Sequence, residues 1–494
     1  MDTSNSQVWS FASAPALHPM KVTVTINKPG TAPGLLFVAP YTWYKVAMIG
    51  QTGALIMDPT GSPIWFRPLD SIDKQNTNFR VQSYKEKPVI TLWQGTISGT
   101  HSADLSLPAG DPESGACFLI LNQHYKIIRK LTAEKGYTAD IHEFTITKQD
   151  TALFTSVKRV PADLTSFGGP PNGYINNYAI QEVDLDTGQL LFFWTALTHI
   201  NPADSMLPVS SATISNRIWD CFHVNSVDEG PDHTLLISMR NMWAIYSIDK
   251  KTGKIIWQLG GKQSDFLIDP NSTFSWQHDA RHRSGNRISL FDNACCASPD
   301  SLPAGPAHGL LLRLDFQNMT ATADRTYYHD PALYVPSQGN LQKLSNGNQL
   351  IGWGQEPHLS EFRKDGNTKE NPAFNFLYDL RFPGHNMSYR SVKNTWVGLP
   401  LYPPSIAIDK PSKKVTLVYA SWNGSTETAA WQVLAGSSPT TLRVIIPSTP
   451  RVGFETQIHV NSIGPYFQVK ALNSSGQLIG TSPHCSHRKK RATI

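Results

Sequence analysis

The sequence predicts an all-β protein, with a six-bladed β-propeller over residues 20–400 and a small β-sandwich of the fibronectin type III or immunoglobulin type over residues 401–486. Two observations support this fold class. Charged residues make up only 16% of the 494, whereas Gly (34), Pro (35) and Trp (13) are plentiful, which favours short strands joined by turns over long amphipathic helices. A hairpin pattern also recurs along the first 400 residues.

The clearest repeat is a β-hairpin in which Asp-x-x-Thr-Gly separates two apolar strands. It occurs in Val183–Phe192 and again in Ile248–Trp257. Asp and Gly suit the tight turn, and the alternating apolar residues suit the flanking strands. Weaker copies predict further turns near residues 58, 122, 315 and 364.

A second pair of strands lies between these hairpins. It is predicted in Asp140–Phe154, His223–Ile237, His278–Leu290 and Gly339–Ile351. Two hairpins in each unit give the four strands of one propeller blade, and six units would surround a central channel. The alternative, a chain of separate sandwich domains, would need linkers, and none is visible.

The composition changes after the proline-rich connector Leu399–Pro404. Short alternating strands are predicted beyond it, in Val415–Trp422, Thr441–Ile446, Glu455–Val460 and Tyr466–Leu472. Because this part has no clustered His, Asp or Glu, we expect it to brace the propeller and not to carry a site.

The charge pattern limits the partners. The formal charge is +5, and four of these charges lie in the run Arg488–Arg491, so residues 487–494 are predicted to be a solvated basic tail. The near-neutral body argues against nucleic acid, and no apolar run is long enough for a membrane helix. The N-terminus lacks a secretory signal, so the chain is expected inside the cell, or outside it if this is a mature form. A homodimer stays open.

Four histidines are the main candidates for chemistry. His142, His223 and His278 begin the innermost strand of three consecutive predicted blades, so they should converge on one mouth of the channel. His358, close to Trp353, follows the next strand and is expected to join them. Arg240 could meet an anion from the same side, with a rim salt bridge as the alternative.

Several standard chemistries are excluded. The sequence has no phosphate-binding GxxxxGK[ST] loop, no GxSxG elbow and no HExxH helix. We expect no cofactor and no metal. A zinc site built from histidines is the alternative, with Glu143, Asp220 and Asp279 as its outer carboxylates.

At the level of motifs the chain resembles the arylsulfate sulfotransferases, and more closely their fungal and actinobacterial branch. The motifs are Trp219–Val227, Ile248–Gly261, Phe274–Ala280 with Phe291–Asn293, Asn346–Gly354 and Ala420–Glu427. The resemblance implies a six-bladed propeller that moves a sulfuryl group from a phenyl sulfate to a phenol through a sulfohistidine, without a nucleotide donor.

The resemblance also implies roles for the candidate residues. We expect His358 to be the nucleophile, His278 a cation that binds the sulfate, and His223 its partner or the acid for the leaving phenolate. His142 would be peripheral. The remaining substrate contacts are expected from Asn225, Asp279, Arg281 and Trp353, and the substrate is expected to be a small aromatic or phenolic molecule.

One segment departs from the family pattern. The bacterial enzymes follow Phe-Asp-Asn with a segment that supplies a sulfate-binding arginine, whereas in this chain Asn293 is followed by Ala294–Ala297, which holds the adjacent Cys295 and Cys296. The charge would then come from Arg240 or Arg281. Two alternative functions stay open: an acid–base cyclase or isomerase on the same propeller, and a propeller that binds a ligand without turnover.

Overall fold

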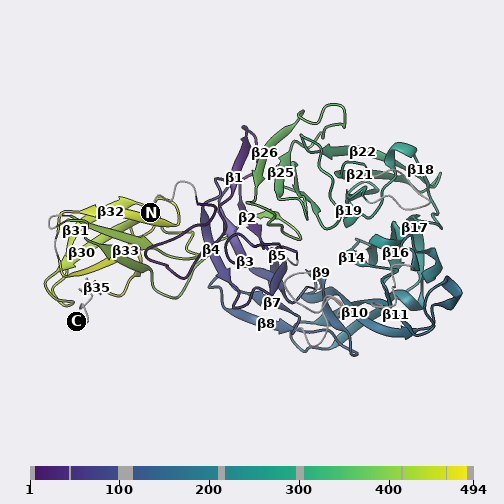
Figure 1. The fold of residues 1–494 in the computed structure, drawn as a ribbon, viewed down its shortest axis with the longest axis horizontal. Helices are drawn as coiled ribbons and strands as arrows, with labels where there is room; N and C mark the ends of the chain where they lie inside the picture. The colour runs from purple at the N-terminus through teal and green to yellow at the C-terminus, as the bar shows by residue number, and fades with distance from the viewer. Residues whose placement is uncertain are drawn as a thin grey trace.

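The computed structural model describes residues 6–43, 46–97, 115–209, 217–295, 305–412, 415–462 and 464–486. The predicted basic tail at 487–494 and Cys296 lie outside these residues. The prediction of an all-β, propeller-like fold is confirmed. Figure 1 shows a ring of sheets beside a second group of strands that includes the C-terminal end of the chain. No helix among the described residues has both the length and the apolar character needed to cross a membrane.

Six sheets of the described residues form the ring, antiparallel except for two short added strands, and each runs from an innermost strand at the channel to an outer strand at the rim. From the inside outwards, the first contains β27 (Val392–Asn394), β2 (Leu35–Val38), β3 (Gly53–Met57) and β4 (Pro63–Pro68). The second contains β5 (Gln75–Tyr84), β6 (Lys87–Gly95), β7 (Cys117–Leu121) and β8 (Ile127–Leu131). The third contains β9 (Thr138–Ile146), β10 (Thr151–Ala162), β11 (Gly173–Asp184) and β12 (Leu190–Thr195), with β13 (Ile218–Trp219) parallel to β11.

The fourth sheet contains β14 (Val224–Glu229), β15 (Thr234–Met239), β16 (Ala244–Asp249) and β17 (Ile255–Gly260). The fifth contains β19 (His278–Arg283), β20 (Arg287–Asp292), β21 (His308–Asp315), β22 (Thr320–Tyr328) and β18 (Leu267–Ile268). The sixth contains β23 (Asn340–Lys343), β24 (Gln349–Gly352), β25 (His358–Phe362), β26 (Phe376–Arg381) and β1 (Thr23–Asn27). Short 3₁₀ helices lie between some strands: η3 (Thr165–Phe167), η4 (Ala196–Thr198), η5 (Pro202–Asp204), η7 (Arg240–Met242) and η8 (Pro270–Ser272).

The six predicted hairpin turns all lie between the third and fourth strands of a sheet. Their geometry explains why the sequence signal is local. The Asp184 carboxylate accepts hydrogen bonds from the N–H groups of residues 186 and 187, and the Asp249 carboxylate does the same for Thr252. The side chain at the head of each of these turns therefore stabilises the turn by itself.

The ring of six sheets is closed by two strands, one near each end of the chain segment that forms the ring. β27 follows the sixth sheet in sequence but pairs with β2 of the first, and β1 precedes the first sheet but pairs with β26 of the sixth. Apolar clusters fill the six interfaces between neighbouring sheets. Examples of facing residues are Leu153 with Val227, Phe118 with Phe144, and Leu36 with Leu380.

The C-terminal strands make two further sheets around a separate apolar cluster that includes Trp431 and Phe467. One holds β28 (Ser405–Asp409), β29 (Thr416–Ser421) and β32 (Glu455–Val460). The other holds β31 (Arg443–Pro450), β30 (Ala430–Gly436), β33 (Tyr466–Leu472), β34 (Leu478–Thr481) and β35 (Cys485–Ser486).

Asn423 attaches this region to the ring at the edge of β4. Its amide oxygen accepts from the N–H of Phe66 at 2.8 Å, and its amide nitrogen donates to the carbonyl of Phe66 at 2.9 Å. The side chain thus replaces the neighbouring strand that an edge strand lacks. The sequence motif Ala420–Glu427 therefore has a structural role.

We expect the substitution Asn423→Ala to lower the free energy of unfolding by about 1–3 kcal/mol, because it leaves two backbone groups of Phe66 without partners. Chemical denaturation measures this. Asn271→Ala, at an exposed asparagine, serves as the control and should change the value by less than about 0.5 kcal/mol. Equal effects of both substitutions would contradict the docking role of Asn423.

Candidate functional site

Two of the four candidate histidines, His223 and His278, lie at the start of an innermost strand, whereas His142 lies in the middle of one. His142 lies in β9, His278 opens β19, and His223 directly precedes β14. The rings of His142 and His223 are 4.8 Å apart, and the ring of Tyr389 lies 5.4 Å from His142 and 6.4 Å from His278. Tyr389 therefore links the three histidines into one cluster.

Each of these strands is irregular where its histidine lies. The pairing register shifts between Phe154 and Ser156 opposite β9, after Val224 in β14 and after His278 in β19. His223 itself has a φ of 51°. Bulges of this kind turn side chains out of the regular alternation of a strand, and they are common beside functional sites.

Two of the histidines are each held by an aspartate. Nδ1 of His142 lies 2.7 Å from a carboxylate oxygen of Asp140, and Nδ1 of His223 is hydrogen-bonded to Asp220. A carboxylate accepts, so Nδ1 carries the proton in both rings and the lone pair of each neutral ring is on Nε2. Neither Nε2 has a hydrogen-bond partner among the described residues. Burial lowers the pKa of His223, although Asp220 opposes this effect.

His278 has a different environment. Its Nδ1 donates to Oδ1 of Asn293 at 2.7 Å, and its Nε2 accepts from the backbone N–H of Gln338 at 3.1 Å. Burial, followed by the nearby charge of Arg240, holds the pKa of His278 well below its usual value. Asp279 does not contact this ring, since its carboxylate bonds to Arg281 and to the N–H of Leu341. The geometry therefore favours a neutral His278 and does not support its expected role as a cation.

Arg240 brings a positive charge to the cluster. Its backbone N–H donates to the carbonyl of His223 at 3.0 Å, and its guanidinium lies 4.6 Å from the centre of the Trp276 ring. One guanidinium nitrogen donates to Pro336 and another to Asn241, while the buried Nε has no partner among the described residues. Burial lowers the pKa of Arg240 to about 10, so the group stays charged at neutral pH. An unsatisfied buried donor beside the histidines suits an anionic group of a ligand.

Aromatic residues surround the cluster. Trp243 and Trp276 are in edge contact, with ring centres 5.3 Å apart, and the ring of Tyr178 lies 6.1 Å from His223. Burial raises the pKa of Tyr389 well above its usual value, and its hydroxyl group has no partner among the described residues. Tyr389 thus remains a proton donor for hydrogen bonds.

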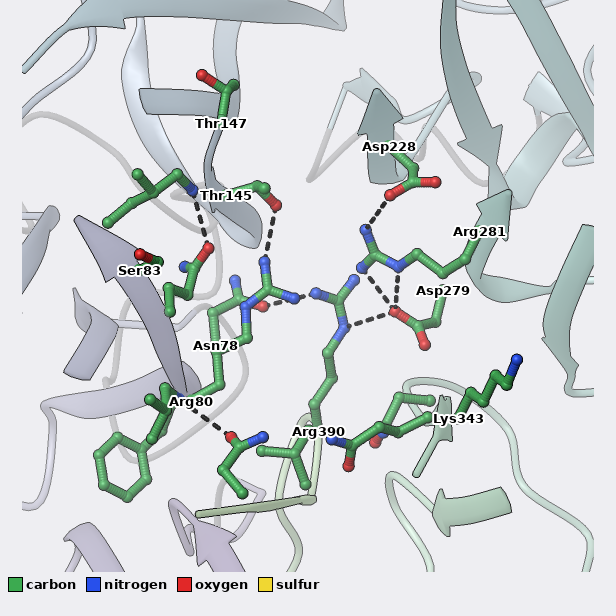
Figure 2. Close-up of a pocket in the computed structure, with 18 of the residues that line it drawn as sticks. Asn78, Arg80, Ser83, Thr145, Thr147, Asp228, Asp279, Arg281, Lys343 and Arg390 are labelled. Carbon is green, nitrogen blue, oxygen red and sulfur yellow. Dashed lines mark hydrogen bonds and ion pairs between the residues drawn. The ribbon is translucent and has the colours of Figure 1, made fainter. Parts of the chain in front are cut away.

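An ion-pair network occupies the channel next to the histidines. The carboxylate of Glu143 is fully buried and pairs with Arg80 of β5, Arg281 of β19 and Arg390, which lies just before β27. Asp279 also pairs with Arg281 and Arg390, as Figure 2 shows. Although burial alone would raise the pKa of Glu143, the three arginines hold it well below its usual value.

This network contains three residues that the sequence analysis places at the substrate. Arg281 and Asp279 are occupied by the ion pairs, and the amide of Asn225 donates to the carbonyl of Gln277. All three are buried. We therefore consider them to position the innermost strands, and Arg281 is not a free cation for sulfate.

A cavity of about 710 Å³ opens beside the network (Figure 2). It is lined by residues of the innermost strands and of the ion-pair network, among them Arg80, Thr145, Asp279, Arg281 and Arg390. None of the three clustered histidines is among its lining residues.

His358 belongs to another part of the molecule. It begins β25, the third strand of its sheet, so it is not equivalent to the other three histidines. It contacts Asp379 at 3.0 Å, and its ring lies 4.7 Å from that of His329. None of its interactions within the described residues involves the histidine cluster. Trp353 is a fully buried core residue that contacts His329 and Phe291, so it does not form a substrate wall.

Several residues of the cluster were not predicted from the sequence. Asp140 lies two residues before His142, and this spacing was a usable signal; Asp220 was named only as an outer carboxylate of the alternative zinc site. Tyr389 and Gln338 offered no signal, because they reach the site only through the closure of the ring.

Comparisons with known proteins identify relatives. The family model described as arylsulfotransferase (ASST) matches residues 114–372. No curated protein matches the sequence. Similar solved structures include a protein of unknown function from Bacteroides caccae, with 11% identity over 73% of this chain and 98% of that chain and a TM-score of 0.40.

Two further structures are similar. One is a catalytically inactive virginiamycin B lyase from Staphylococcus aureus with quinupristin, with 9% identity over 81% of this chain and 96% of that chain and a TM-score of 0.34. The other is the Cps50 (Swd1) β-propeller domain of Myceliophteria thermophila, with 11% identity over 70% and 94% and a TM-score of 0.30. We draw no functional conclusion from likenesses at this level.

The channel network leads to a prediction about stability. Glu143→Gln should lower the free energy of unfolding by about 3–5 kcal/mol, because it leaves buried arginines without their shared carboxylate. Asp186→Asn removes a half-exposed carboxylate from its pairs with Lys85 and Arg129, and should cost about 0–1 kcal/mol. Denaturant titration at neutral pH compares the two. Similar losses would contradict a central role for Glu143.

Proposed function

This chain belongs to the arylsulfotransferase family, and from that premise we propose that it transfers a sulfuryl group from an aryl sulfate to a phenolic acceptor without a nucleotide donor. The observation that carries the proposal is the pair of aspartate-held histidines, 4.8 Å apart, beside the unsatisfied Nε of Arg240. The aromatic residues Trp243 and Trp276 nearby suit the rings of such substrates. Family membership supports a transferase-like enzyme, and the assignments of residues below are our own.

In this proposal His223 is the nucleophile. Asp220 holds the proton on Nδ1, so the lone pair of Nε2 is available to attack sulfur. The N–S bond forms as the S–O bond to the aryl group breaks, and the electron pair of that bond leaves with the phenolate. The positive charge on the sulfated imidazole is balanced by Asp220.

His142 would handle the proton. Held by Asp140, it would act in its imidazolium form and give its Nε2 proton to the leaving phenolate. In the second half it takes the proton from the acceptor phenol, whose oxygen attacks sulfur while the N–S bond breaks. Arg240 and the hydroxyl of Tyr389 would bind the sulfate oxygens, on which negative charge is concentrated.

This assignment replaces the one based on sequence. His358 lies on the third strand of its sheet, and the two nitrogens of His278 already have hydrogen-bond partners. His142 moves from a peripheral role to a central one, because its ring makes an edge contact with that of His223.

Acid–base chemistry without sulfuryl transfer is a second candidate. Two imidazoles in edge contact, each with its own aspartate, also suit a cyclisation or isomerisation in which one ring removes a proton and the other returns it. The lack of an arginine after Asn293 favours this alternative.

We extend the proposal to the finer features of the chain. The six ring sheets correspond to six blades within residues 20–400, and the C-terminal sheets correspond to a sandwich within 401–486. The motifs support the fungal and actinobacterial branch. We propose small aromatic or phenolic molecules as the partners of the site.

The first test uses 4-nitrophenyl sulfate as the donor and phenol as the acceptor. Release of nitrophenolate that depends on phenol, together with formation of phenyl sulfate, would support transfer. If neither product forms and no sulfated histidine is found by mass spectrometry, the acid–base alternative gains support. A tightly bound aromatic ligand that is never turned over would favour a binding protein.

Substitutions test the roles of the two histidines. His223→Ala should abolish both transfer and the covalent intermediate, and His142→Gln should slow transfer by about 10²–10⁴-fold, because the phenolate then leaves without its acid. His282→Gln is the matched control, since His282 also pairs with an aspartate, Asp228, at 3.0 Å. A sulfated peptide that contains His358 instead of His223 would restore the assignment based on sequence.

The pH dependence gives an independent prediction. His223 must be neutral to attack, and burial puts its pKa below the usual value of about 6.5. We therefore expect the fall in kcat/KM for the donor that accompanies protonation of His223 to occur only below about pH 6.5.

The substitution Asp220→Asn removes the charge that raises the pKa of His223, so it should move this fall to still lower pH. Rate profiles of both proteins measure the shift. If kcat/KM already falls as the pH is lowered through 7, or if the fall moves to higher pH in Asp220→Asn, the role of His223 would be contradicted.

A further inference from the structure

A second cluster of titratable side chains lies between the end of the fifth sheet and the sixth sheet, away from the proposed sulfuryl-transfer site. His329 follows β22, His358 opens β25 and Asp379 lies in β26. Nε2 of His329 is 3.2 Å from Oδ1 of Asp379, and Nδ1 of His358 is 3.0 Å from Oδ2. One nitrogen from each ring and a carboxylate oxygen all lie within 4.8 Å of one another.

The partner of the other nitrogen of His329 fixes its tautomer. Nδ1 lies 2.8 Å from the carbonyl oxygen of Pro331, which can only accept, so Nδ1 carries the proton. The neutral ring then turns the lone pair of Nε2 towards a carboxylate oxygen that is also an acceptor. Two acceptors that face each other in a buried site need a cation between them: a proton that makes the ring an imidazolium, or a metal ion.

The surrounding groups hold the carboxylate in place. Ser360 donates to Oδ1 of Asp379 at 2.8 Å and Thr25 donates to Oδ2 at 2.5 Å, while Trp353 donates to Ser360. Each carboxylate oxygen keeps a further lone pair. Metal ligands in proteins are commonly held by such contacts outside the metal's own coordination shell: a histidine ring donates its other N–H to a backbone carbonyl, and a carboxylate accepts from hydroxyl groups. His329 and Asp379 make contacts of these two kinds.

The spacing also suits a metal. Zinc binds histidine nitrogen and carboxylate oxygen at about 2.0–2.2 Å, so neighbouring ligands of a tetrahedral ion lie about 3.4 Å apart. The separations between the nitrogens and the carboxylate oxygens are 3.0, 3.2 and 3.3 Å. The side chain of His358 is 15% exposed, whereas those of His329 and Asp379 are 3% and 4% exposed, so a water molecule could reach a fourth position from the side of His358.

We propose that His329, His358 and Asp379 bind a zinc ion. The backbone of Asp379 pairs with Ile26 of β1, so the ion would lie where the N-terminal strand joins the sixth sheet. Bound zinc would stabilise the closed ring, because it joins side chains from three segments of the chain. The site is independent of the sulfuryl-transfer chemistry, and it gives His358 a role that the catalytic assignment does not.

The test measures metal binding by the full-length protein after removal of metals with a chelator. Titration with ZnCl₂ against a chromophoric chelator should show one tight equivalent per chain. Co²⁺ in the same site should produce the strong visible absorption of a four-coordinate ion. The midpoint of thermal unfolding should rise with zinc.

His358→Gln is the main variant, since His358 is the most exposed of the three ligands, and His329→Gln and Asp379→Asn complete the set. Each should weaken zinc binding by at least about 100-fold and remove the cobalt spectrum. His282→Gln is the matched control. His282 pairs with Asp228, but among the described residues no second histidine takes part in that pair. This variant should leave both measurements unchanged.

Two results would overturn the proposal. One is a protein that binds no zinc equivalent. The other is zinc binding that persists in His358→Gln while that variant unfolds at the same temperature as the wild type. A buried imidazolium–carboxylate pair would then account for the cluster. Neither result depends on whether the protein transfers sulfuryl groups.

Discussion

The buried carboxylate of Glu143 is the interaction on which the centre of the molecule depends. Three arginines pair with this one side chain of the third sheet. They come from the second sheet, from the fifth sheet and from the position just before β27 of the first. In a propeller the sheets pack against their neighbours through apolar faces, which fixes the spacing between adjacent sheets but not the approach of strands across the channel. The ion pairs supply this constraint, and their buried charges permit only a narrow range of geometries.

The histidine cluster lies directly on this framework. Glu143 follows His142 in β9, and Arg390 follows Tyr389 before β27. The residues that carry the proposed chemistry are therefore chain neighbours of the residues that hold the strands together. This arrangement lets the two aspartate-held imidazoles lie in edge contact at a fixed separation, as a preorganised site requires.

The features that sequence analysis predicted well are those with local causes. The hairpin turns were predictable because the aspartate at the head of a turn makes its hydrogen bonds within a few residues. His223 and His278 were predictable because each lies where the innermost strand of its repeat begins, whereas His142 lies in the middle of its strand. His358 was correctly expected after the second strand of its unit, but it begins the third strand, which lies away from the channel, so it does not join the other three.

Features with distant causes could not be predicted in this way. The tautomer of His278 depends on Gln338 and Asn293, and the availability of Arg281 depends on Glu143, which is 138 residues away. The protein family was predictable, because several motifs in order carry it.

The pairing of β27 with β2 has a consequence for biosynthesis. Since the innermost strand of the first sheet comes from residues 392–394, that sheet stays incomplete until almost four-fifths of the polypeptide has left the ribosome. Contacts so distant in sequence form slowly. Tyr389 and Arg390 arrive with the same segment, so a nascent chain that has not yet closed lacks both the central ion pairs and a wall of the histidine cluster. Closure of the ring and assembly of the candidate site would thus be a single late event in the maturation of the chain.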